Sequence, residues 1–337
     1  MTDSKKNLTI EALEELVSSD LARVEELLTD SVQGSDDLLD ELLSHLATAG
    51  GKRMRPILTL LTAHLGSEGE VASEKVIRAA TAVELTHLAT LYHDDVMDSA
   101  PQRRGVKAVQ LEWGNNRAIL AGDVLFARAS RLVSMLGPKA IRYHAETFER
   151  LCMGQLHETF GPKDEDPVDF YIQVLADKTG SLINASAAFG AWMGGADDDT
   201  ADIVRQFGER IGVAFQIADD VIDFASDEEL TGKTAGTDLV EGVATMPVLL
   251  LRKHAENGTL DEAGKELLRD IDEADLENEE ILKSVVDRLK AHEVLEETRE
   301  KAHEWADYAI EAIEPLPETV VKEGLRQFAS LAVDRMA

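Results

Sequence analysis

The chain has 337 residues, of which 44% are hydrophobic, enough for a sizeable core and a reason to exclude global disorder. Its formal net charge of −31 excludes a protein built for non-specific nucleic-acid binding, because such proteins present basic patches to phosphates. The single cysteine, Cys152, allows no intrachain disulfide, so a cytoplasmic protein is expected. No run of sequence approaches the roughly 18 apolar residues of a membrane span, so no transmembrane segment is expected.

Apolar residues recur at helical spacing along almost the whole chain, beginning with a stripe in residues 8–30. Period-two alternation with β-branched residues is nearly absent, so no sheet is predicted, and each proline falls at the edge of a predicted segment. In chain order the predicted helices are 8–31, 35–49, 56–66, 71–98, 107–135, 138–159, 168–194, 198–225, 246–257, 260–273, 278–311 and 316–336. The pattern therefore predicts an all-α fold.

Two segments between these helices are predicted loops. Residues 160–167 have ordinary turn chemistry, whereas residues 226–245 carry three glycines in a polar setting and are long for a connection. Such long loops are often functional lids or simply mobile. Neither segment is rich enough in linker residues to divide the chain, so one domain over 1–337 is expected.

The pattern Asp-Asp-x-x-Asp occurs four times in this acidic chain. The occurrences are Asp36–Asp40, Asp94–Asp98, Asp198–Asp202 and Asp219–Asp223. The first and third follow helix-start signals and are interpreted as acidic first turns that the helix dipole favours. The second and fourth instead end long apolar helices.

Carboxylates at positions i and i+4 lie about 40° apart around a helix, so each of those two motifs presents a pair on one face. On a half-buried face such carboxylates repel each other and lose hydration, which implies a metal ion or a basic partner. Magnesium prefers a few carboxylates together with substrate phosphate oxygens. The alternative is a fortuitous surface cluster at two helix ends.

The few basic residues gather near glycines and near the acidic motifs. A loop at 50–56 carries three cations. Arg103 and Arg104 follow the first motif. Lys178 is the first residue of the tripeptide Lys-Thr-Gly, and Lys233 lies in the long loop. Cations beside carboxylate clusters suit a metal-bridged polyanion, and diphosphates are natural candidates. Taken singly, the arginine pair could neutralise an aspartate, the lysine could extend from an apolar face, and a lone histidine is more often a core residue.

The order and spacing of these motifs resemble the trans-isoprenyl (polyprenyl) diphosphate synthase family. The matching segments are GGKRMRP, HDDVMDSAPQRRG, KTG, FQIADDVID and GKTAGTDL, within about residues 45–250. The resemblance implies the isoprenoid synthase fold, a single-domain helical bundle around a central cavity. It also implies a homodimer, for which the apolar segments 107–135 and 138–159 are candidate interfaces.

In that family two aspartate-rich motifs face each other across the cavity and hold Mg²⁺, about three ions in the liganded state. The metal-binding positions implied here are Asp94, Asp95, Asp98, Asp219, Asp220 and Asp223. Helix geometry favours the outer two aspartates of each motif as direct ligands. Asp95 and Asp220 point about 100° away and would act through water.

The resemblance also assigns the substrate positions. Those implied for isopentenyl diphosphate are Lys52, Arg55, His87 and Arg104, and those implied for the allylic diphosphate are Arg103, Lys178, Thr179, Gln216 and Lys233. Residues expected to act in catalysis are Asp94, Asp98, Lys178, Thr179, Gln216 and Asp219. The expected reaction is Mg²⁺-dependent sequential condensation of isopentenyl diphosphate with farnesyl or geranylgeranyl diphosphate. One departure stands at Val243, where many relatives carry lysine, so altered lid contacts are expected there.

Product length is expected to depend on the helix that bears the first motif. Short-chain relatives place bulky aromatics four or five residues before the first aspartate, whereas this chain has Thr90 and Ala89. We therefore expect a product of about C30–C50, of the kind used for quinone side chains, with transient membrane contact when it is released. Tyr92 lies about 200° round the helix from Asp94 and should miss the tunnel. The alternative is that Ala89 and Thr90 merely allow close helix packing.

Other functions remain as alternatives at this stage. A geranylgeranyl or farnesyl diphosphate synthase would share every motif and differ only in product length. A non-catalytic regulatory subunit should have lost acidic motifs, and a terpene cyclase would need no second diphosphate site. A metal-buffering acidic protein would not account for the ordered cations.

Overall fold

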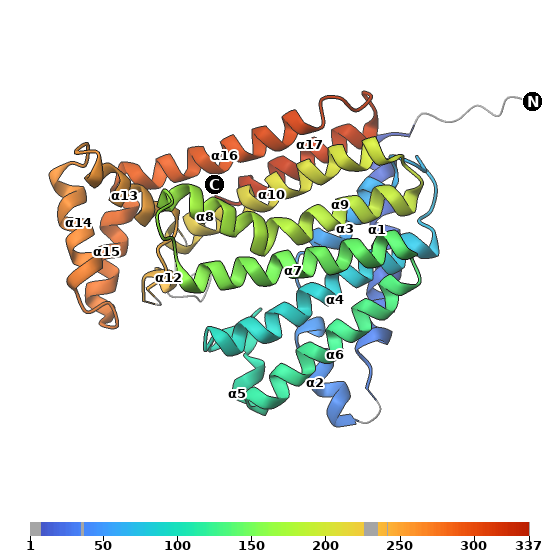
Figure 1. Ribbon diagram of the computed structural model, residues 1–337, viewed down its shortest axis with the longest axis horizontal. Helices are drawn as coiled ribbons and strands as arrows, with labels where there is room; N and C mark the ends of the chain where they lie inside the picture. Colours follow the sequence, from blue (N-terminus) through green and yellow to red (C-terminus); the bar gives the residue numbers. More distant parts are fainter. Residues whose placement is uncertain (1–7, 35–36, 226–234, 241, 337) are drawn as a thin grey trace, which may run out of the picture. The chain divides into compact units, whose positions relative to one another are not determined.

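The computed structural model describes residues 8–34, 37–225, 235–240 and 242–336 (Figure 1). In chain order its elements are α1 (Ile10–Val32), α2 (Asp37–Thr48), α3 (Met54–Ala63), α4 (Glu74–Met97), β1 (Gln102–Arg103), β2 (Val106–Lys107), α5 (Val109–Trp113), α6 (Asn115–Ser134), α7 (Pro138–Phe160), α8 (Pro167–Leu175), a π-helical turn η1 (Ala176–Gly180), α9 (Ser181–Gly194), α10 (Asp198–Ala225), α12 (Thr237–Val240), α13 (Met246–Glu256), α14 (Glu262–Glu273), α15 (Glu279–Ala291), α16 (Glu293–Ala312), α17 (Val320–Val333) and a 3₁₀ turn η2 (Asp334–Met336). The all-α prediction is confirmed.

The helices begin where capping chemistry places them. Asp166 accepts hydrogen bonds from the first backbone N–H groups of α8, and Pro167 occupies the first position of that helix. Acidic residues stand in the first turns of α2 and α10, which agrees with the interpretation of those two acidic patterns as helix starts. Within the described residues, no helix combines the length and hydropathy that a membrane crossing requires.

The chain divides into two compact units built from interleaved segments. Unit 1 comprises residues 1–149, 182–208 and 312–326, and unit 2 comprises residues 150–181, 209–311 and 327–337. Neither unit is one continuous stretch of sequence. The expectation of one domain over 1–337 stays a prediction.

Unit 1 is organised around α4, which packs most extensively on α6 and also on α3 and α1 (Figure 1). Most residues of α4 are buried, and four of them are alanines, which lets neighbouring helices approach. Tyr92 is fully buried and its hydroxyl donates to the carbonyl of Leu42 at 2.7 Å, so this aromatic points toward α2. Helix α9 lies so close to α3 that a Cβ at Gly190 would fall 2.1 Å from the carbonyl oxygen of Thr59.

Unit 2 places α13 against α8 and α14, and α14 against α15. The ion pair Lys253–Asp166, at 3.1 Å, joins α13 to the residue that caps α8. A Cβ at Gly154 on α7 would lie 2.5 Å from the backbone nitrogen of Lys178, so only glycine allows the π-helical turn to approach α7 this closely.

The structure differs from the sequence-based prediction at several breaks. The predicted helix 107–135 is interrupted at Gly114, which has φ of 84°, and the predicted helix 278–311 is interrupted at His292, which is extended. The segment 168–194 contains the π-helical turn, and α12 lies inside the predicted loop 226–245.

The expectation of no sheet was wrong for one short hairpin. Strands β1 and β2 pair antiparallel, with Gln102 opposite Lys107 and Arg103 opposite Val106. The two turn residues between them, Arg104 and Gly105, have φ of 53° and 77°, and positive values at both positions are what a type I′ hairpin turn requires.

Candidate active site

The first acidic motif ends α4 in unit 1. Asp94 is partly exposed and Asp98, the residue that caps the helix, is exposed, so this pair faces outward. Asp95 is fully buried and accepts a hydrogen bond from Nε of Arg103 at 2.7 Å. The inward position of the middle aspartate agrees with the helical angle expected from sequence. Arg103 therefore contacts the motif through Asp95.

A buried glutamate holds the cationic loop that precedes α3. Arg53, with φ of 49°, donates through Nη1 to Glu84 at 2.8 Å, through Nε to Glu25 at 2.5 Å and through Nη2 to the carbonyl of Ala47 at 2.9 Å. These acceptors come from α4, α1 and α2. The sequence analysis counted Arg53 among the three cations of this loop without giving it a role, and it missed Glu84. The available signal for Glu84 was a glutamate inside the apolar run of α4.

The hairpin turn brings Arg104 onto the same loop. Its Nη1 donates to the carbonyl oxygens of Leu46 at 2.9 Å and Gly50 at 2.5 Å, and its Nη2 lies 3.7 Å from Glu84. A Cβ at Gly51 would lie 3.0 Å from Cζ of Arg104, so the loop backbone and the guanidinium are in close contact. The approach of Arg104 therefore explains Gly51, whereas Gly50 is favoured by its φ of 89°.

Arg55 and His87 complete this cluster. Burial, together with the charge of Arg104, lowers the pKa of Arg55 to about 10, although Glu84 opposes the shift. Burial and the neighbouring arginines hold the pKa of His87 well below its usual value, so its imidazole is neutral at pH 7. Among the described residues, the buried Nε of Arg55 has no hydrogen-bond acceptor. The cluster, to which Lys52 adds an exposed lysine, therefore suits an anion.

The second acidic motif lies near the end of α10 in unit 2. Asp219 and Asp223 are partly exposed, and Asp219 pairs with Arg335 at 2.5 Å. Asp220 is buried and accepts hydrogen bonds from the hydroxyl of Tyr171, at 2.9 and 3.1 Å, and from the backbone nitrogen of Met246 at 3.1 Å. Burial is the main cause that raises the pKa of Asp220 well above its usual range. As in the first motif, the middle aspartate points into the unit.

The π-helical turn carries Lys178 and Thr179, which are both partly exposed. Asp177 anchors this turn, because it accepts a hydrogen bond from Nε of Arg150 at 2.5 Å and another from the side chain of Gln173 at 2.8 Å. Lys178 pairs with Glu158 on α7 at 2.5 Å. A π-helical insertion shifts the facing of the residues that it carries and is frequent at functional sites.

The remaining predicted residues are placed as follows. Gln216 is partly exposed and precedes Asp219 by three residues on α10, so the two share a face of the helix. Lys233 lies outside the described residues. Val243 is 37% exposed, and its backbone nitrogen donates to the carbonyl of Asp238 at 2.9 Å.

The donor chemistry of both motifs fits a hard divalent ion, since each offers carboxylate oxygens one helical turn apart. Among the described residues, no three acidic, histidine or cysteine side chains are already gathered into a metal-holding group. A divalent ion held by either motif would take its other ligands from water or substrate oxygens.

The polyprenyl synthetase family model matches residues 36–289. The chain is 47% identical over 234 residues to the nonaprenyl diphosphate synthase of Mycobacterium tuberculosis, with 69% of each chain covered. It is 34% identical to the heptaprenyl diphosphate synthase component 2 of Geobacillus stearothermophilus, over 96% of this chain and 98% of that one. The solved structure of geranylgeranyl pyrophosphate synthase from Corynebacterium glutamicum, complexed with calcium and isoprenyl diphosphate, is similar with a TM-score of 0.82 and 40% identity, over 96% of this chain and 98% of that one.

Proposed function

This chain belongs to the polyprenyl synthetase family, and from this premise we propose that it condenses isopentenyl diphosphate repeatedly with an allylic diphosphate to form a long-chain all-trans polyprenyl diphosphate. Prenyl transfer is the activity of its named relatives, and the family assignment made from the motifs is confirmed. The chain is accordingly a prenyltransferase.

The observation that carries the proposal is the cluster in unit 1. Arg53 and Arg104 pair with Glu84, and Arg55 and the neutral His87 lie in the same cluster. Arg103 joins the first acidic motif through Asp95. A diphosphate needs several directed N–H donors, and arginine supplies them in a fixed planar arrangement. A metal-buffering protein would have no use for such a set of donors.

We assign the residues as follows in this reaction. Arg55, Arg104, Lys52 and His87 bind the diphosphate of isopentenyl diphosphate, and the neutral imidazole donates one hydrogen bond. Divalent ions, when bound by the two acidic motifs, supply charge that stabilises the departing allylic diphosphate.

Unit 2 contributes the groups proposed for the allylic substrate. Lys178 releases Glu158 to donate to the allylic diphosphate, and Arg103 is proposed for the same substrate. Thr179 and Gln216 direct oxygen dipoles toward the allylic cation that forms when the carbon–oxygen bond breaks. The alkene of isopentenyl diphosphate then attacks that carbon, and the departed diphosphate takes up the proton that the adduct loses. Mg²⁺ is the ion we propose, because it suits sites completed by phosphate oxygens.

A product of about C30–C50 is supported by the names of two relatives, a nonaprenyl and a heptaprenyl synthase. Small side chains at Ala89 and Thr90, both buried on α4, support the same length. A geranylgeranyl product is the second candidate, and the observation in its favour is the similarity to the Corynebacterium glutamicum enzyme. One relative is named component 2 of a heptaprenyl diphosphate synthase. A subunit that needs a partner is therefore a further outcome that the test distinguishes.

The test is incubation of the purified chain with Mg²⁺, labelled isopentenyl diphosphate and farnesyl or geranylgeranyl diphosphate, followed by chromatographic sizing of the products. A ladder that ends beyond C25 supports the long-chain proposal, and a stop at C20 or C15 contradicts it while the family stands. No Mg²⁺-dependent product with any primer would indicate a subunit that needs a partner.

Ala89→Phe should shorten the ladder, because a phenyl ring at this buried position would block a tunnel beside α4. Thr90→Ser is the matched control, since it keeps a small side chain on the same helix, and it should leave the product unchanged. Overpacking by the ring costs about 1–3 kcal/mol, so the free energy of unfolding is measured for both variants. A folded Ala89→Phe variant with an unchanged ladder would show that the tunnel runs elsewhere.

A homodimer and a cytoplasmic location belong to the same proposal. Exposed apolar side chains on α5, α6 and the start of α7 support an interface between copies, and they include Leu111, Leu120 and Ile141, which are 52%, 61% and 47% exposed. The composition and the single cysteine support the cytoplasm.

A further inference from the structure

Arg335, in the 3₁₀ turn η2 of unit 2, contacts the second acidic motif. Its Nη2 lies 2.5 Å from Oδ1 of Asp219, and its Cζ lies 4.2 Å from the ring centroid of Phe215. Phe215 and Asp219 are four residues apart on α10, so they share one face of that helix. The guanidinium thus stacks on an aromatic ring while it neutralises an aspartate assigned to metal binding.

The hydrogen bonding of Arg335 is incomplete. Its Nε and Nη1 are buried and have no acceptor among the residues that the structure describes. Arg53 is a useful contrast, because all three of its nitrogens donate to carboxylate or carbonyl oxygens. A buried donor without an acceptor is costly, so a purely structural arginine should resemble Arg53. The pattern at Arg335 instead suits a group that exchanges partners.

We propose that Arg335 acts as a counter-cation at the second acidic motif. It holds Asp219 while no metal is bound and competes with a divalent ion for that carboxylate. The inference rests on the proposed function, which assigns Asp219 to the metal. A carboxylate already paired with a guanidinium attracts a second cation less, and the ion must displace the arginine or accept its repulsion. Arg335 therefore lowers the metal affinity of the substrate-free protein and leaves its unused donors for the anionic group that accompanies the metal.

The test compares Mn²⁺ binding by the full chain without substrate, with free Mn²⁺ followed by electron paramagnetic resonance. Arg335→Gln should bind Mn²⁺ about three- to tenfold more tightly than the unaltered chain, the range expected for loss of one partly buried ion pair. Arg335→Lys keeps the charge and should stay near the unaltered chain. Arg299→Gln, which removes an arginine that pairs with Glu296 within α16, is the matched control and should change nothing.

A second comparison isolates the contact. In an Asp219→Asn background, Arg335→Gln should no longer tighten Mn²⁺ binding, because the carboxylate for which the two cations compete is gone. Thermal unfolding in a chelator shows whether each variant is folded. An Arg335→Gln variant that is folded and binds Mn²⁺ within twofold of the unaltered chain, or more weakly, overturns the proposal and leaves Arg335 as a structural anchor.

Product formation separates this proposal from the proposed function. If the unaltered chain forms polyprenyl product but Arg335→Gln does not tighten Mn²⁺ binding, the inference about Arg335 fails alone. If the chain forms no product with any primer but Arg335→Gln tightens Mn²⁺ binding through Asp219, the counter-cation is supported and the proposed function fails.

Discussion

Glu84 determines where the arginines of unit 1 lie. Its side chain is 2% exposed and contacts Arg53 and Arg104 directly. In Glu84→Gln these cations would repel each other without a buried counter-charge, so we expect KM for isopentenyl diphosphate to rise roughly tenfold, with a smaller change in kcat. The free energy of unfolding should fall by about 3 kcal/mol, because one member of a buried ion pair is removed.

Steady-state kinetics with each substrate varied in turn and denaturant unfolding check this prediction. Glu25→Gln is the control, since Glu25 pairs with the same Arg53 but is 41% exposed, and its loss should cost no more than about 1 kcal/mol. A Glu84→Gln variant with unchanged KM for isopentenyl diphosphate would contradict the positioning role.

His144 provides a pH dependence of stability. Its Nε2 lies 2.9 Å from the hydroxyl of Thr86, and burial lowers its pKa below the usual value of about 6.5. As the pH falls through the usual pKa of about 6.5, this histidine takes up a proton in the unfolded chain but not in the native protein. The stability is therefore complete above the unfolded pKa and is lost as the pH falls toward the lower native pKa.

We expect Tm to fall when the pH is lowered from about 7.5 to about 5.5, and to fall less in His144→Gln than in the unaltered chain. Differential scanning calorimetry at several pH values provides the measurement. His303→Gln, an exposed position on α16, should reproduce the slope of the unaltered chain. Equal slopes in all three proteins would place the responsible groups elsewhere, for example at the other buried histidines.

Sequence reasoning at the residue scale was limited by distance along the chain. The inward position of Asp95 and Asp220 follows from the angle between helical neighbours, so it could be predicted. The partners of Asp219 and Arg53 could not, because Arg335 and Glu25 lie 116 and 28 residues away from them in sequence. Only packing brings such charges together.

At the scale of the elements, the π-helical turn η1 depends on its anchor, Asp177. Asp177 links it to Arg150 and Gln173, so in Asp177→Asn the turn should lose its charged anchor and Lys178 its position. We expect kcat/KM for the allylic primer to fall about tenfold while KM for isopentenyl diphosphate changes little. Asp177→Glu should restore part of the activity, and equal effects on both substrates would indicate a general loss of structure.

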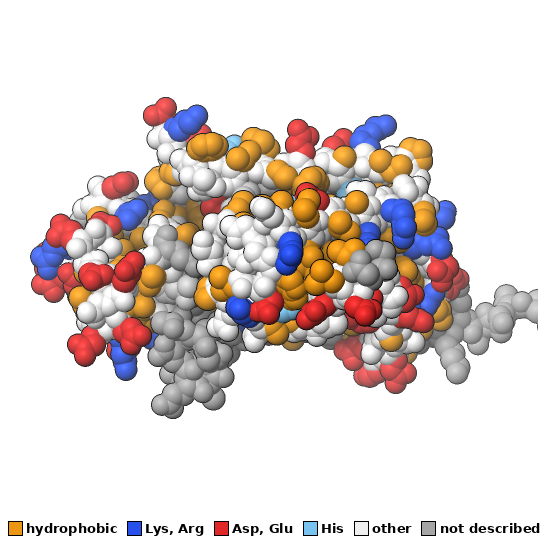
Figure 2. All heavy atoms as spheres, turned by 90° about the horizontal axis from the view of Figure 1, so that it is seen from below, with side chains coloured by type: hydrophobic (Ala, Val, Ile, Leu, Met, Phe, Trp, Pro, Cys, Tyr) orange, Lys and Arg blue, Asp and Glu red, His pale blue; other side chains and the backbone are white. Residues whose placement is uncertain are grey.

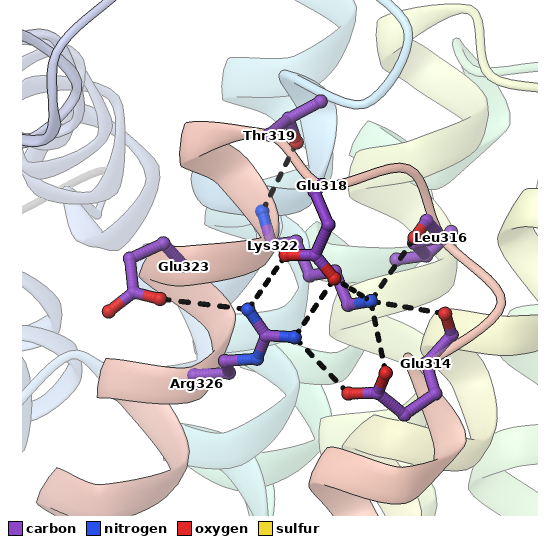
Figure 3. A network of polar contacts seen from close by, with 7 residues as sticks. All are labelled: Glu314, Leu316, Glu318, Thr319, Lys322, Glu323 and Arg326. Atoms are coloured by element: carbon purple, nitrogen blue, oxygen red, sulfur yellow. Dashed lines mark hydrogen bonds and ion pairs between the residues drawn. The ribbon is translucent and has the colours of Figure 1, made fainter.

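The connection between α16 and α17 is closed by a polar network within unit 1 (Figure 3). Nζ of Lys322, whose side chain is 1% exposed, donates to Glu318 at 2.6 Å and to the carbonyl oxygens of Glu314 and Leu316 at 3.0 and 3.2 Å. Arg326 bridges the same two glutamates, and its hydrogen bonds, followed by those of Lys322, lower the pKa of Glu318 to about 2.

Lys322→Met should lower the free energy of unfolding by about 1–3 kcal/mol, because two backbone carbonyls lose a buried donor while the methionine retains the apolar contacts. Lys283→Met, a change on α15 in unit 2 that removes the same charge, is the matched control. Urea unfolding of both variants measures the two changes. Equal losses of free energy of unfolding would show that the network contributes nothing specific.

The differences between predicted and observed elements have physical causes. The apolar periodicity of the sequence continues through 168–194. One inserted residue in a π-helical turn changes the direction of the side chains that follow it without interrupting this periodicity. The break at His292 lies between two good helix formers, so no glycine or proline marks it. The hairpin after α4 is too short to show alternation, and only Gly105 signals its turn.

At the scale of the whole molecule, charge and exposed apolar surface are the main features. Acidic side chains are spread over the face in Figure 2, with hydrophobic side chains exposed between them. The composition predicts the negative charge of this surface. The loop at 50–56 and the arginines after the first acidic motif indicate where the cations are concentrated. The division into two interleaved units could not be predicted, because α7, α10 and α17 each continue from one unit into the other without a linker.

The proposed homodimer is tested on α6, where Ile119, Leu120 and Val124 are 42%, 61% and 39% exposed. Leu120→Glu should convert the dimer to a monomer in multi-angle light scattering, because a twofold interface meets the new charge twice. Leu331→Glu, on α17 and 71% exposed, should leave the mass unchanged. A dimer that persists in Leu120→Glu would place the interface on another surface.

The interleaving of the two units has a consequence for how the cell makes this protein. Unit 1 includes residues 312–326, so it stays incomplete on the ribosome long after α4 and α6 have been synthesised. At about 5–20 residues per second, the interval between residues 149 and 326 lasts roughly 10–35 s. During that time Leu13 on α1 and Leu61 on α3, which lie against Gly324 of α17, lack this partner, which makes the nascent chain a natural client for chaperones.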